Sequence, residues 1–370
     1  MSCRVVFWAE SFWPSIGGVE ILGEQLMSVL KGRGYEFIVV TNQWHEDWPE
    51  EEEVGGVPVH RFPFRSAISE RRVDLLASIK IRLDALFRDF APDLVHVNLA
   101  GPSVIFLAMS EPARMTPSVV TIHNLLAEAG PGEGALTKRV LGAAARVVAP
   151  SETLRAHVES LYPELGSRLL VIRNALGAPA LEPGELRFEQ PRVVCLARLV
   201  PEKGVDLAVK AFPAVLDRFP AARLVVAGEG GERGPLDELV GRLGLEGSVE
   251  FLGQVEPGHV PALLDSATVV VVPSRWVEPF GLVALEAALA ARPVVATRTG
   301  GLAEIVVDGE TGFLVDREAP NSIAEGVIAL LESPVKAQHM ATWARQRALD
   351  EFGWEQFVDA YDALFRDAMR

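Results

Sequence analysis

Two glutamates eight residues apart, Glu278 and Glu286, lie in the segment PSRWVEPFGLVALEAALAARPVV (273–295). Glu278 precedes a predicted helix and Glu286 lies on it, and eight helical residues span about 12 Å. An ionised carboxylate accepts two hydrogen bonds and therefore suits a vicinal diol. The separation is comparable to that between the two polyol ends of a sugar nucleotide. The alternative interpretation is that both carboxylates are solvated at the surface.

The residues between the two glutamates, Phe280, Gly281 and Leu282, are predicted to start the helix. The free N–H groups and the positive dipole end of a helix N-terminus attract a phosphate. One loop would therefore offer carboxylates to two diols and amides to a diphosphate.

Two cations, Arg198 and Lys203, flank a predicted strand-to-helix turn in CLARLVPEKGVDLAVKAF (195–212). Two cations at such a place can stabilise the charge that develops on a leaving diphosphate without a metal ion. The chain has no Asp-x-Asp pair to hold a divalent cation. We therefore expect no metal and no other cofactor. The alternative interpretation, which the spacing does not exclude, is that both residues are ordinary surface cations.

The loop SFWPSIGGVE (11–20) follows the first predicted strand and contains Gly17 and Gly18. Glycines let the backbone come close to a ligand, and a helix starting near Val19 would aim free amides at it. A simple turn explains the same pair of residues.

His123 ends the predicted strand SVVTIHN (118–124). Near neutral pH a histidine can donate or accept a proton, so His123 is a candidate catalytic residue. A hydrogen-bonded structural histidine is the alternative. His96 and Asn98 end another strand in the same way and are weaker candidates.

Apolar runs alternate with helical patterns through most of the chain, and the continuous Val, Ile and Leu runs are typical of strands buried on both faces of a parallel sheet. The predicted strands are 3–9, 37–42, 93–98, 118–124, 146–151, 169–175, 191–199, 222–230, 249–254, 268–274 and 293–298. The predicted helices include 19–32, 72–90, 204–218, 235–243, 281–291 and 320–332, and the segment from about 335 to 370 is predicted to be helical throughout.

The segment 177–191 has three prolines, two glycines and no period, which indicates a connection between domains. The chain is therefore predicted to be α/β with two Rossmann-like parallel-sheet domains, 1–176 and 177–351. Ligands of such sheets bind beyond the carboxyl ends of the strands, so we expect the site in a cleft that the two domains face.

The 370 residues carry a formal net charge of −15, which argues against nucleic acid as a partner. Cys3 and Cys195 lie in apolar runs and indicate free thiols in a reducing compartment. The apolar stretch after Met1 is short and contains Glu10, so it does not look like a secretion signal, and no run is long enough to cross a membrane. We expect a cytoplasmic protein.

The ordered set of motifs resembles the large retaining glycosyltransferase family 4, also called glycosyl transferases group 1, which includes bacterial mannosyl- and glucosyltransferases and has the GT-B fold. The resemblance covers nearly the whole chain. The motifs are PSIGGVE, VVTIHN, VVAPSE, ARLVPEKG, LVVAGEG, VEFLGQV, PSRWVEPFG, TGGLAEIV and DGETGFLV.

The resemblance implies a retaining, metal-independent transfer of a hexose-type sugar from a nucleotide diphosphate to a hydroxyl of a sugar, a lipid-linked glycan or a small polyol. It assigns Arg198 and Lys203 to the donor diphosphate. Glu278 would hold hydroxyls of the transferred sugar and Glu286 the ribose.

The remaining roles follow in the same way. The amides around Phe280–Leu282 would contact the phosphate and sugar, and Gly17 and Gly18 would face the donor phosphate and the acceptor. His123 would lie near the transferred sugar, and the terminal helix, about 352–370, would cross back to the N-terminal, acceptor-binding domain, leaving the donor to the C-terminal one.

One departure concerns the domain junction, where many members read Asn-Gly-Val-Asp and this chain has Asn174-Ala175-Leu176-Gly177. We assign no ligand role there. A sugar-nucleotide epimerase, a glycan phosphorylase and a non-catalytic sugar-nucleotide-binding protein remain alternatives, whereas a dehydrogenase is disfavoured because no G-x-G-x-x-G follows the first strand.

Residues 65–88 hold six Lys and Arg against three Asp and Glu, together with Leu75, Leu76, Ile79, Leu83 and Leu86. Such a basic amphipathic helix either rests on anionic lipid or packs on its own sheet. The nucleotide base, the sugar, the acceptor and the oligomeric state are not specified by the sequence.

Overall fold

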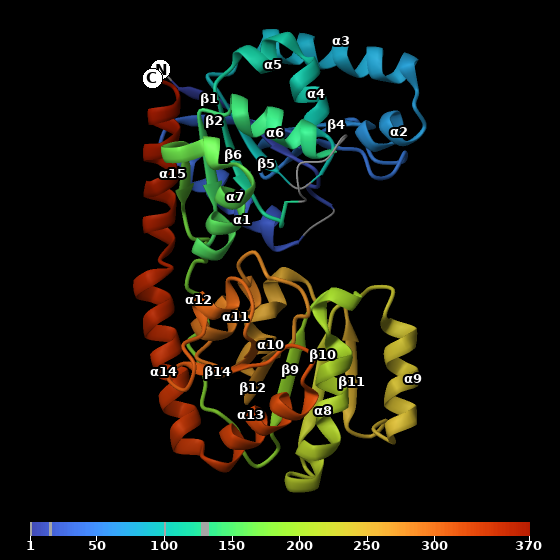
Figure 1. Ribbon diagram of the computed structural model, residues 1–370, viewed down its shortest axis with the longest axis vertical. Coiled ribbons are helices and arrows are strands. Elements are labelled where there is room, and N and C mark those ends of the chain that lie inside the picture. Colours follow the sequence, from blue (N-terminus) through green and yellow to red (C-terminus); the bar gives the residue numbers. More distant parts are fainter. Residues whose placement is uncertain (1, 15–16, 100, 127–132) are drawn as a thin grey trace. The chain divides into compact units, whose positions relative to one another are not determined.

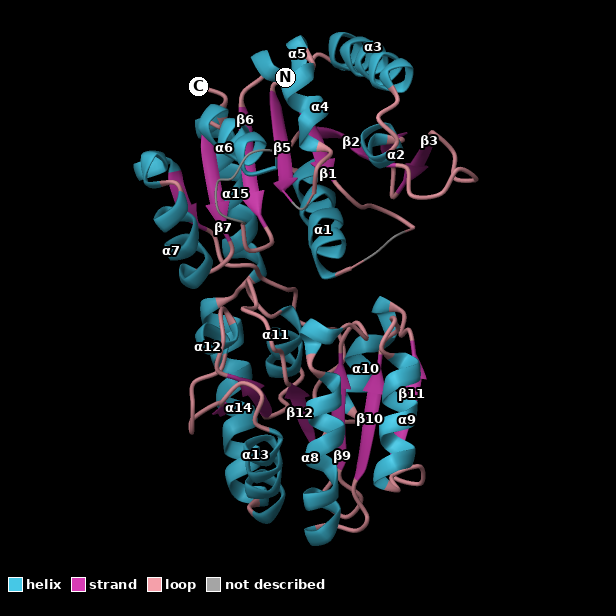
Figure 2. Cartoon of the chain, turned by 45° about the vertical axis from the view of Figure 1, so that its right-hand side comes forward, coloured by secondary structure: helices cyan, strands magenta, loops and turns pink. Residues whose placement is uncertain are grey.

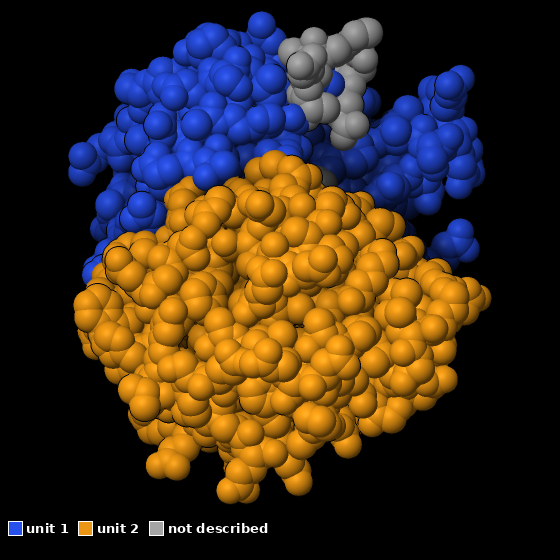
Figure 3. All heavy atoms as spheres, turned by 60° about the horizontal axis from the view of Figure 1, so that its bottom comes forward, with its two compact units in different colours: residues 1–173, 355–370 blue, residues 174–354 orange. Residues whose placement is uncertain are grey.

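The computed structural model of the chain describes residues 2–14, 17–99, 101–126 and 133–370. They form two compact units, Met1–Arg173 with Glu355–Arg370, and Asn174–Trp354 (Figure 3). Each unit contains one sheet flanked by helices, as the sequence predicts for an α/β chain with two parallel-sheet domains.

The first unit is built on an eight-stranded sheet with the order β3-β4-β2-β1-β5-β6-β7-β8. Its strands are β1 (Cys3–Ala9), β2 (Tyr35–Asn42), β3 (Glu51–Val54), β4 (Val57–Phe62), β5 (Leu94–Leu99), β6 (Ser118–Ile122), β7 (Arg146–Ala149) and β8 (Leu169–Val171). The β3–β4 pair is antiparallel and the other described pairs are parallel. The carboxyl ends of the parallel strands therefore share one edge.

Helices cover this first sheet (Figure 1). They are α1 (Gly18–Gly32), α2 (Phe64–Ser69), α3 (Val73–Phe90), α4 (Val104–Met109), α5 (Glu111–Met115), α6 (Glu133–Ala143), α7 (Glu152–Leu161), the 3₁₀ helix η1 (Pro163–Arg168) and most of α15 (Trp354–Ala368). Alternate residues of β1 face opposite sides: Val6 and Trp8 join one apolar core, whereas Phe7 packs against His96 at 5.3 Å between ring centroids. Burial on both faces explains the continuous apolar run.

The C-terminal helix α15 packs on the first unit, as the sequence predicts (Figure 1). Tyr361 lies against His96, with ring centroids 5.4 Å apart, and its hydroxyl is 3.0 Å from Thr121 Oγ1. Tyr35 donates a hydrogen bond of 2.6 Å to Asp362 Oδ1. A mostly buried apolar face and a few polar anchors therefore attach the last helix to the sheet.

The basic amphipathic segment forms α3 and the residues before it. Leu75, Leu76 and Leu86 pack against the apolar core of the first unit, and Ile79 and Leu83 are buried in it. Four of its six cations form ion pairs: Arg72 with Asp74, Lys80 and Arg88 with Asp84, and Arg82 with Glu50. The apolar face of this helix packs on its own sheet.

The second unit is built on a six-stranded parallel sheet with the order β11-β10-β9-β12-β13-β14. Its strands are β9 (Arg192–Leu196), β10 (Arg223–Ala227), β11 (Val249–Gly253), β12 (Val269–Val272), β13 (Val294–Thr297) and β14 (Gly312–Val315). The order places the loops after β10, β9, β12 and β13 side by side at one edge of the sheet.

Helices lie on both faces of the second sheet (Figure 2). They are η2 (Pro201–Lys203), α8 (Val205–Arg218), α9 (Arg233–Leu243), η3 (Pro257–His259), α10 (Val260–Asp265), α11 (Leu282–Leu289), α12 (Leu302–Ile305), α13 (Pro320–Glu332) and α14 (Pro334–Glu351). Val193 and Cys195 of β9 face the core with α8, α9 and α13, whereas Val194 faces the core with α10, α11 and α12.

The sequence-based prediction omitted three strands: β3, β4 and β14. Strand β3 has the sequence EEEV and alternates between exposed and half-buried residues at the edge of its sheet. Strand β14 has four residues and follows a Gly-containing turn. Short or acidic edge strands lack the buried apolar run on which the prediction relied.

Candidate active site

An ion pair at the carboxyl edge of the second sheet connects two of the loops that the sequence singles out. Lys203, at the end of η2 after β9, donates from Nζ to Glu278 Oε1 at 2.6 Å. Ser274 Oγ donates to the same carboxylate oxygen at 2.5 Å. Glu278 is buried and Lys203 is half-buried, so the attraction between them is screened less than at the surface. In the described part of the chain, no hydrogen bond reaches Glu278 Oε2.

Glycines let the backbones of these loops approach each other closely. A Cβ on Gly300, at a φ of 53°, would lie 2.0 Å from the carbonyl oxygen of Glu278, and one on Gly301 would lie 2.4 Å from that of Phe280. The Gly301 amide donates to the Glu278 carbonyl at 2.8 Å. The loop after β13 therefore fixes the backbone that carries Glu278, which explains the TGG motif.

A glycine also allows close backbone packing in the turn that contains Lys203. Gly204 has a φ of 63°, and a Cβ there would lie 2.2 Å from the carbonyl oxygen of Pro273. The Arg275 amide donates to the Glu202 carbonyl at 2.8 Å, and the Arg275 guanidinium binds the carboxylate of Asp206. The loops after β9 and β12 thus form one unit around the Lys203–Glu278 pair.

Arg198 lies on the exposed part of the loop after β9, and none of the described carboxylates forms an ion pair with it. Its neighbours Ala197 and Leu199 are packed against the GEG turn, since a Cβ on Gly228 or Gly230 would lie 1.9 or 2.2 Å from their carbonyl oxygens. Arg198 therefore extends from a closely packed backbone with no ion-pair partner among the described residues.

Glu286 lies on α11, whose N-cap is Gly281 at a φ of 106°. Within the described residues its carboxylate has neither a hydrogen bond nor an ion pair, and burial raises the pKa of Glu286 to about 7. A half-buried carboxylate without a partner is typical of a ligand site. The alternative of a solvated side chain is wrong for Glu278, which is buried, whereas Glu286 is half-buried.

Two nearby side chains were not predicted. Trp276 lies with its ring centroid 5.1 Å from Lys203 Nζ, and its buried Nε1 has no hydrogen-bond partner among the described residues. Ser274 is fully buried on Glu278. Both lie in the quoted PSRWVEPFG motif, but spacing carries no information on which of its side chains turn inward.

The first unit holds the other predicted residues. His123 directly follows β6, is buried, and its Nε2 lies 2.8 Å from Asn98 Oδ1. An amide oxygen only accepts hydrogen bonds, so Nε2 donates. Burial lowers the pKa of His123 to about 4. At neutral pH the ring is therefore uncharged, and its Nε2–H orients Asn98.

His96 has a structural environment. Its Nε2 lies 2.9 Å from Thr121 Oγ1, and its ring packs against Phe7, Tyr361 and Phe365. This buried histidine connects the sheet with α15.

Gly17 is the N-cap of α1 and Gly18 is its first residue, so the helix begins one residue before the predicted start. Both glycines are exposed. Gly17 has an extended backbone, with a φ of −142°. Residues 15 and 16, which belong to the same loop, lie outside the described residues.

Among the described residues, no group of three or more His, Cys, Asp or Glu is placed to hold a metal ion. No helix in the same ranges has the length and apolar character needed to cross a membrane.

Comparison with known proteins identifies the family. The model of the glycosyl transferases group 1 matches residues 182–347, and that of glycosyltransferase family 4 matches residues 16–176. A glycogen synthase of Mycobacterium tuberculosis is 30% identical over 315 residues, which cover 80% of this chain and 73% of that protein. The chain belongs to the family 4, group 1 glycosyltransferases.

Two further relatives of this glycosyltransferase span nearly the whole chain. A GDP-mannose-dependent alpha-(1-6)-phosphatidylinositol monomannoside mannosyltransferase of Mycobacterium tuberculosis is 27% identical, with 95% of each chain covered. The structure of a sucrose-phosphate synthase from Thermosynechococcus elongatus has a TM-score of 0.83 at 23% identity and covers 99% of this chain and 98% of that one. The predicted GT-B fold is confirmed.

Replacing Gly300 by alanine should destabilise the second unit by about 2 to 4 kcal/mol and weaken nucleotide binding, because the new methyl group would meet the Glu278 backbone. Gly309→Ala is the matched control: Gly309 also has a positive φ, 79°, but a Cβ there meets no atom within 4 Å. Urea unfolding should show a clearly smaller loss of unfolding free energy for the control, about 1 kcal/mol. Equal losses in the two variants would contradict the proposed backbone packing.

The raised pKa of Glu286 predicts that Glu286→Gln increases the stability of the folded protein by an amount that depends on pH. The folded state holds the proton of this carboxyl more tightly than the unfolded state, so the native glutamate contributes stability at low pH and loses it as pH rises toward 7. Relative to the native chain, the variant should gain thermal stability at pH 8 and gain little at pH 4.5. A melting series across this range measures the effect, and a gain independent of pH would contradict it.

Proposed function

We propose that this glycosyltransferase moves a hexose-type sugar from a nucleotide diphosphate sugar to a hydroxyl of an acceptor, with retention of configuration and without a metal ion. The bond between the anomeric carbon and the diphosphate oxygen breaks, and a bond from the same face of that carbon to the acceptor oxygen forms. The acceptor's proton goes to the leaving diphosphate oxygen. The protein positions the reactants and stabilises the leaving charge.

The observation that carries this proposal is the Lys203–Glu278 pair at the carboxyl edge of the second sheet, with Arg198 on the same loop as Lys203. The diphosphate gains negative charge as it leaves, and Arg198, on the same loop as Lys203, forms no ion pair with any described carboxylate. Their cations take the role that a metal ion has in other phosphate sites. When no donor is bound, Glu278 balances the charge of Lys203. When a donor binds, Lys203 would also donate a hydrogen bond to a phosphate oxygen.

The carboxylates complete the donor site. Glu278 has one oxygen held by Lys203 and Ser274 and the other without a hydrogen bond among the described residues, which suits hydroxyls of the transferred sugar. Glu286 has no polar partner among the described residues, which suits the ribose diol. The amides around Phe280, Gly281 and Leu282 start α11 and would contact the phosphates and sugar.

The first unit is proposed to bind the acceptor. Gly17 and Gly18 begin α1 with exposed backbone, which supports close approach of the donor phosphate and the acceptor. His123 is proposed to act near the transferred sugar as a neutral ring that orients Asn98.

Two further features support the substrate class and compartment. The names of two relatives, a glycogen synthase and a GDP-mannose-dependent mannosyltransferase, support a hexose donor, and the second supports a lipid-linked acceptor among the candidates. Both cysteines are free thiols, which supports a cytoplasmic location. Contact with the inner face of the membrane stays a prediction.

Arg198→Ala should lower kcat/KM for nucleotide release by at least about 100-fold, as loss of one charge-stabilising donor does in other enzymes. Arg242→Ala is the control, because Arg242 lies exposed on α9 and pairs only weakly with Glu238 at 3.7 Å. The assay uses UDP-, GDP- and ADP-hexoses with a panel of sugar, polyol and lipid-linked acceptors, with and without EDTA.

The proposal predicts acceptor-dependent nucleotide release that EDTA leaves unchanged. Interconversion of the donor sugar without nucleotide release would indicate an epimerase, and sugar phosphate formed from a glycan and inorganic phosphate would indicate a phosphorylase. Donor binding without any turnover would indicate a binding protein. Each of these outcomes would contradict the proposed transfer.

A further inference from the structure

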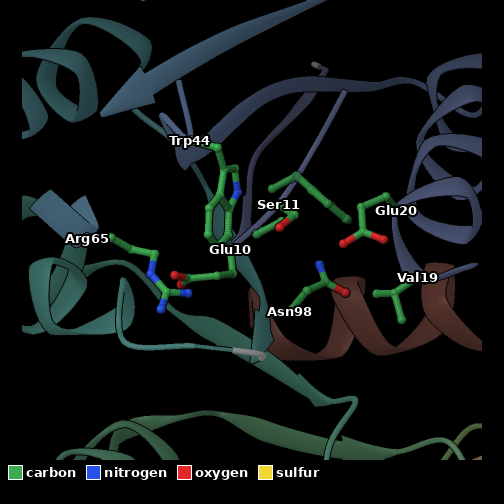
Figure 4. A pocket seen from close by; sticks show the side chains of 9 residues that line it. Glu10, Ser11, Val19, Glu20, Trp44, Arg65 and Asn98 are labelled. Carbon is green, nitrogen blue, oxygen red and sulfur yellow. The ribbon is translucent and has the colours of Figure 1, made fainter. Parts of the chain in front are cut away.

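A cavity of about 220 Å³ opens at the carboxyl edge of the first sheet. Glu10 follows β1, Trp44 follows β2, Asn98 is the penultimate residue of β5, and Arg65 lies on α2 after β4. These four strands are neighbours in the sheet order. The cavity is therefore built by one unit alone (Figure 4). It is smaller than the roughly 300–1,000 Å³ of drug-sized sites, which suits a single sugar ring or a small cyclic polyol.

The cavity wall contains a buried carboxylate oxygen without a partner. Glu10 is 6% exposed, and its Oε2 accepts a hydrogen bond of 3.1 Å from the Ser103 amide. Its Oε1 has no partner within the described residues. A Cβ on Gly101 would lie 2.4 Å from the Glu10 side-chain carboxyl carbon, so this glycine leaves room for the carboxylate. Buried carboxylate oxygens require hydrogen-bond donors, and a ligand hydroxyl is one.

Asn98 contributes an unpaired donor to the same wall. It is also 6% exposed, and its Oδ1 is held by His123 Nε2 at 2.8 Å. Its Nδ2 has no acceptor in the part of the chain that the structure describes. A hydroxyl both donates and accepts, so neighbouring hydroxyls of a polyol can satisfy Glu10 and Asn98 together. This explains why His123 fixes the Asn98 amide.

Trp44 and Arg65 form another part of the wall (Figure 4). The indole of Trp44 is 37% exposed and offers an apolar face. The Arg65 guanidinium lies 4.8 Å from the Trp44 ring centroid. Arg65 is exposed, and no described carboxylate forms an ion pair with it. A stacked guanidinium whose hydrogen-bond donors are unused is suited to bidentate binding of a phosphate or a carboxylate.

We propose that this cavity is the acceptor subsite and that the acceptor is a cyclic polyol with an anionic substituent, a phosphate or a carboxylate. Glu10 and Asn98 bind its hydroxyls, Trp44 packs on the apolar face of its ring, and Arg65 binds its anionic group. The assignment of the cavity to the acceptor rests on the proposed transferase function. The chemistry of the ligand rests on the cavity itself.

The test measures binding of four probes to the full chain by titration calorimetry: glucose, glucose 6-phosphate, glucuronate and inorganic phosphate. Both anionic sugars should bind at least tenfold more tightly than glucose and than inorganic phosphate. Arg65→Gln should remove this preference, and Glu10→Gln should weaken binding of all three sugars. Arg114→Gln is the matched control, since Arg114 is an exposed arginine on α5 outside the cavity.

Glu10 is buried, so its variant could fail to fold, whereas Arg65 is exposed and its variant tests the proposal independently. Equal affinity for glucose and its phosphate, or an anion preference that survives Arg65→Gln, would overturn the inference. Inorganic phosphate binding as tightly as glucose 6-phosphate would also overturn it. Binding and slow hydrolysis of a nucleotide sugar are measured separately: if they are present while the anionic polyols fail to bind, the transferase function stands and the acceptor proposal falls.

Discussion

The ion pair between Lys203 and Glu278 is the interaction on which the proposed donor site depends. It joins the loops after β9 and β12, two neighbouring strands, and places a cation and a carboxylate at the same edge of the sheet. Gly204, Gly300 and Gly301 allow the surrounding backbones to pack closely enough for this contact. The same geometry that holds the loops together places both charges where we propose that a phosphate and a sugar bind.

Several buried or half-buried polar groups have fewer hydrogen-bond partners than such positions require. Glu286 is held with a raised pKa, and Glu10 Oε1, Asn98 Nδ2 and Trp276 Nε1 have no partners among the described residues. Such groups cost stability unless a ligand satisfies them. They occur at the carboxyl edges of both sheets, where α/β folds bind ligands. Stability given up at these places agrees with the proposal that both units bind polar substrates.

The fold was largely predictable, because Val, Ile and Leu runs such as those of β1 and β9 identify buried parallel strands. The edge strands β3 and β14 were not, since short segments lack that pattern. Motif order selected Arg198, Lys203, Glu278 and Glu286, but it did not show that Lys203 contacts Glu278. Contacts between loops distant in sequence depend on backbone geometry, as does the low pKa of His123, which follows from burial. For the same reason, Glu10, Trp44 and Arg65 had no sequence signal as a cavity.

A double-mutant cycle on nucleotide release tests the central claim most directly. Lys203→Met, Glu278→Gln and the double variant, each verified as folded, are compared by kcat/KM with the native chain. If the pair acts as one unit, each single change costs at least about 100-fold and the double variant is little worse than the poorer single variant. Losses that multiply in the double variant, or native kcat/KM in either single variant, would contradict the account.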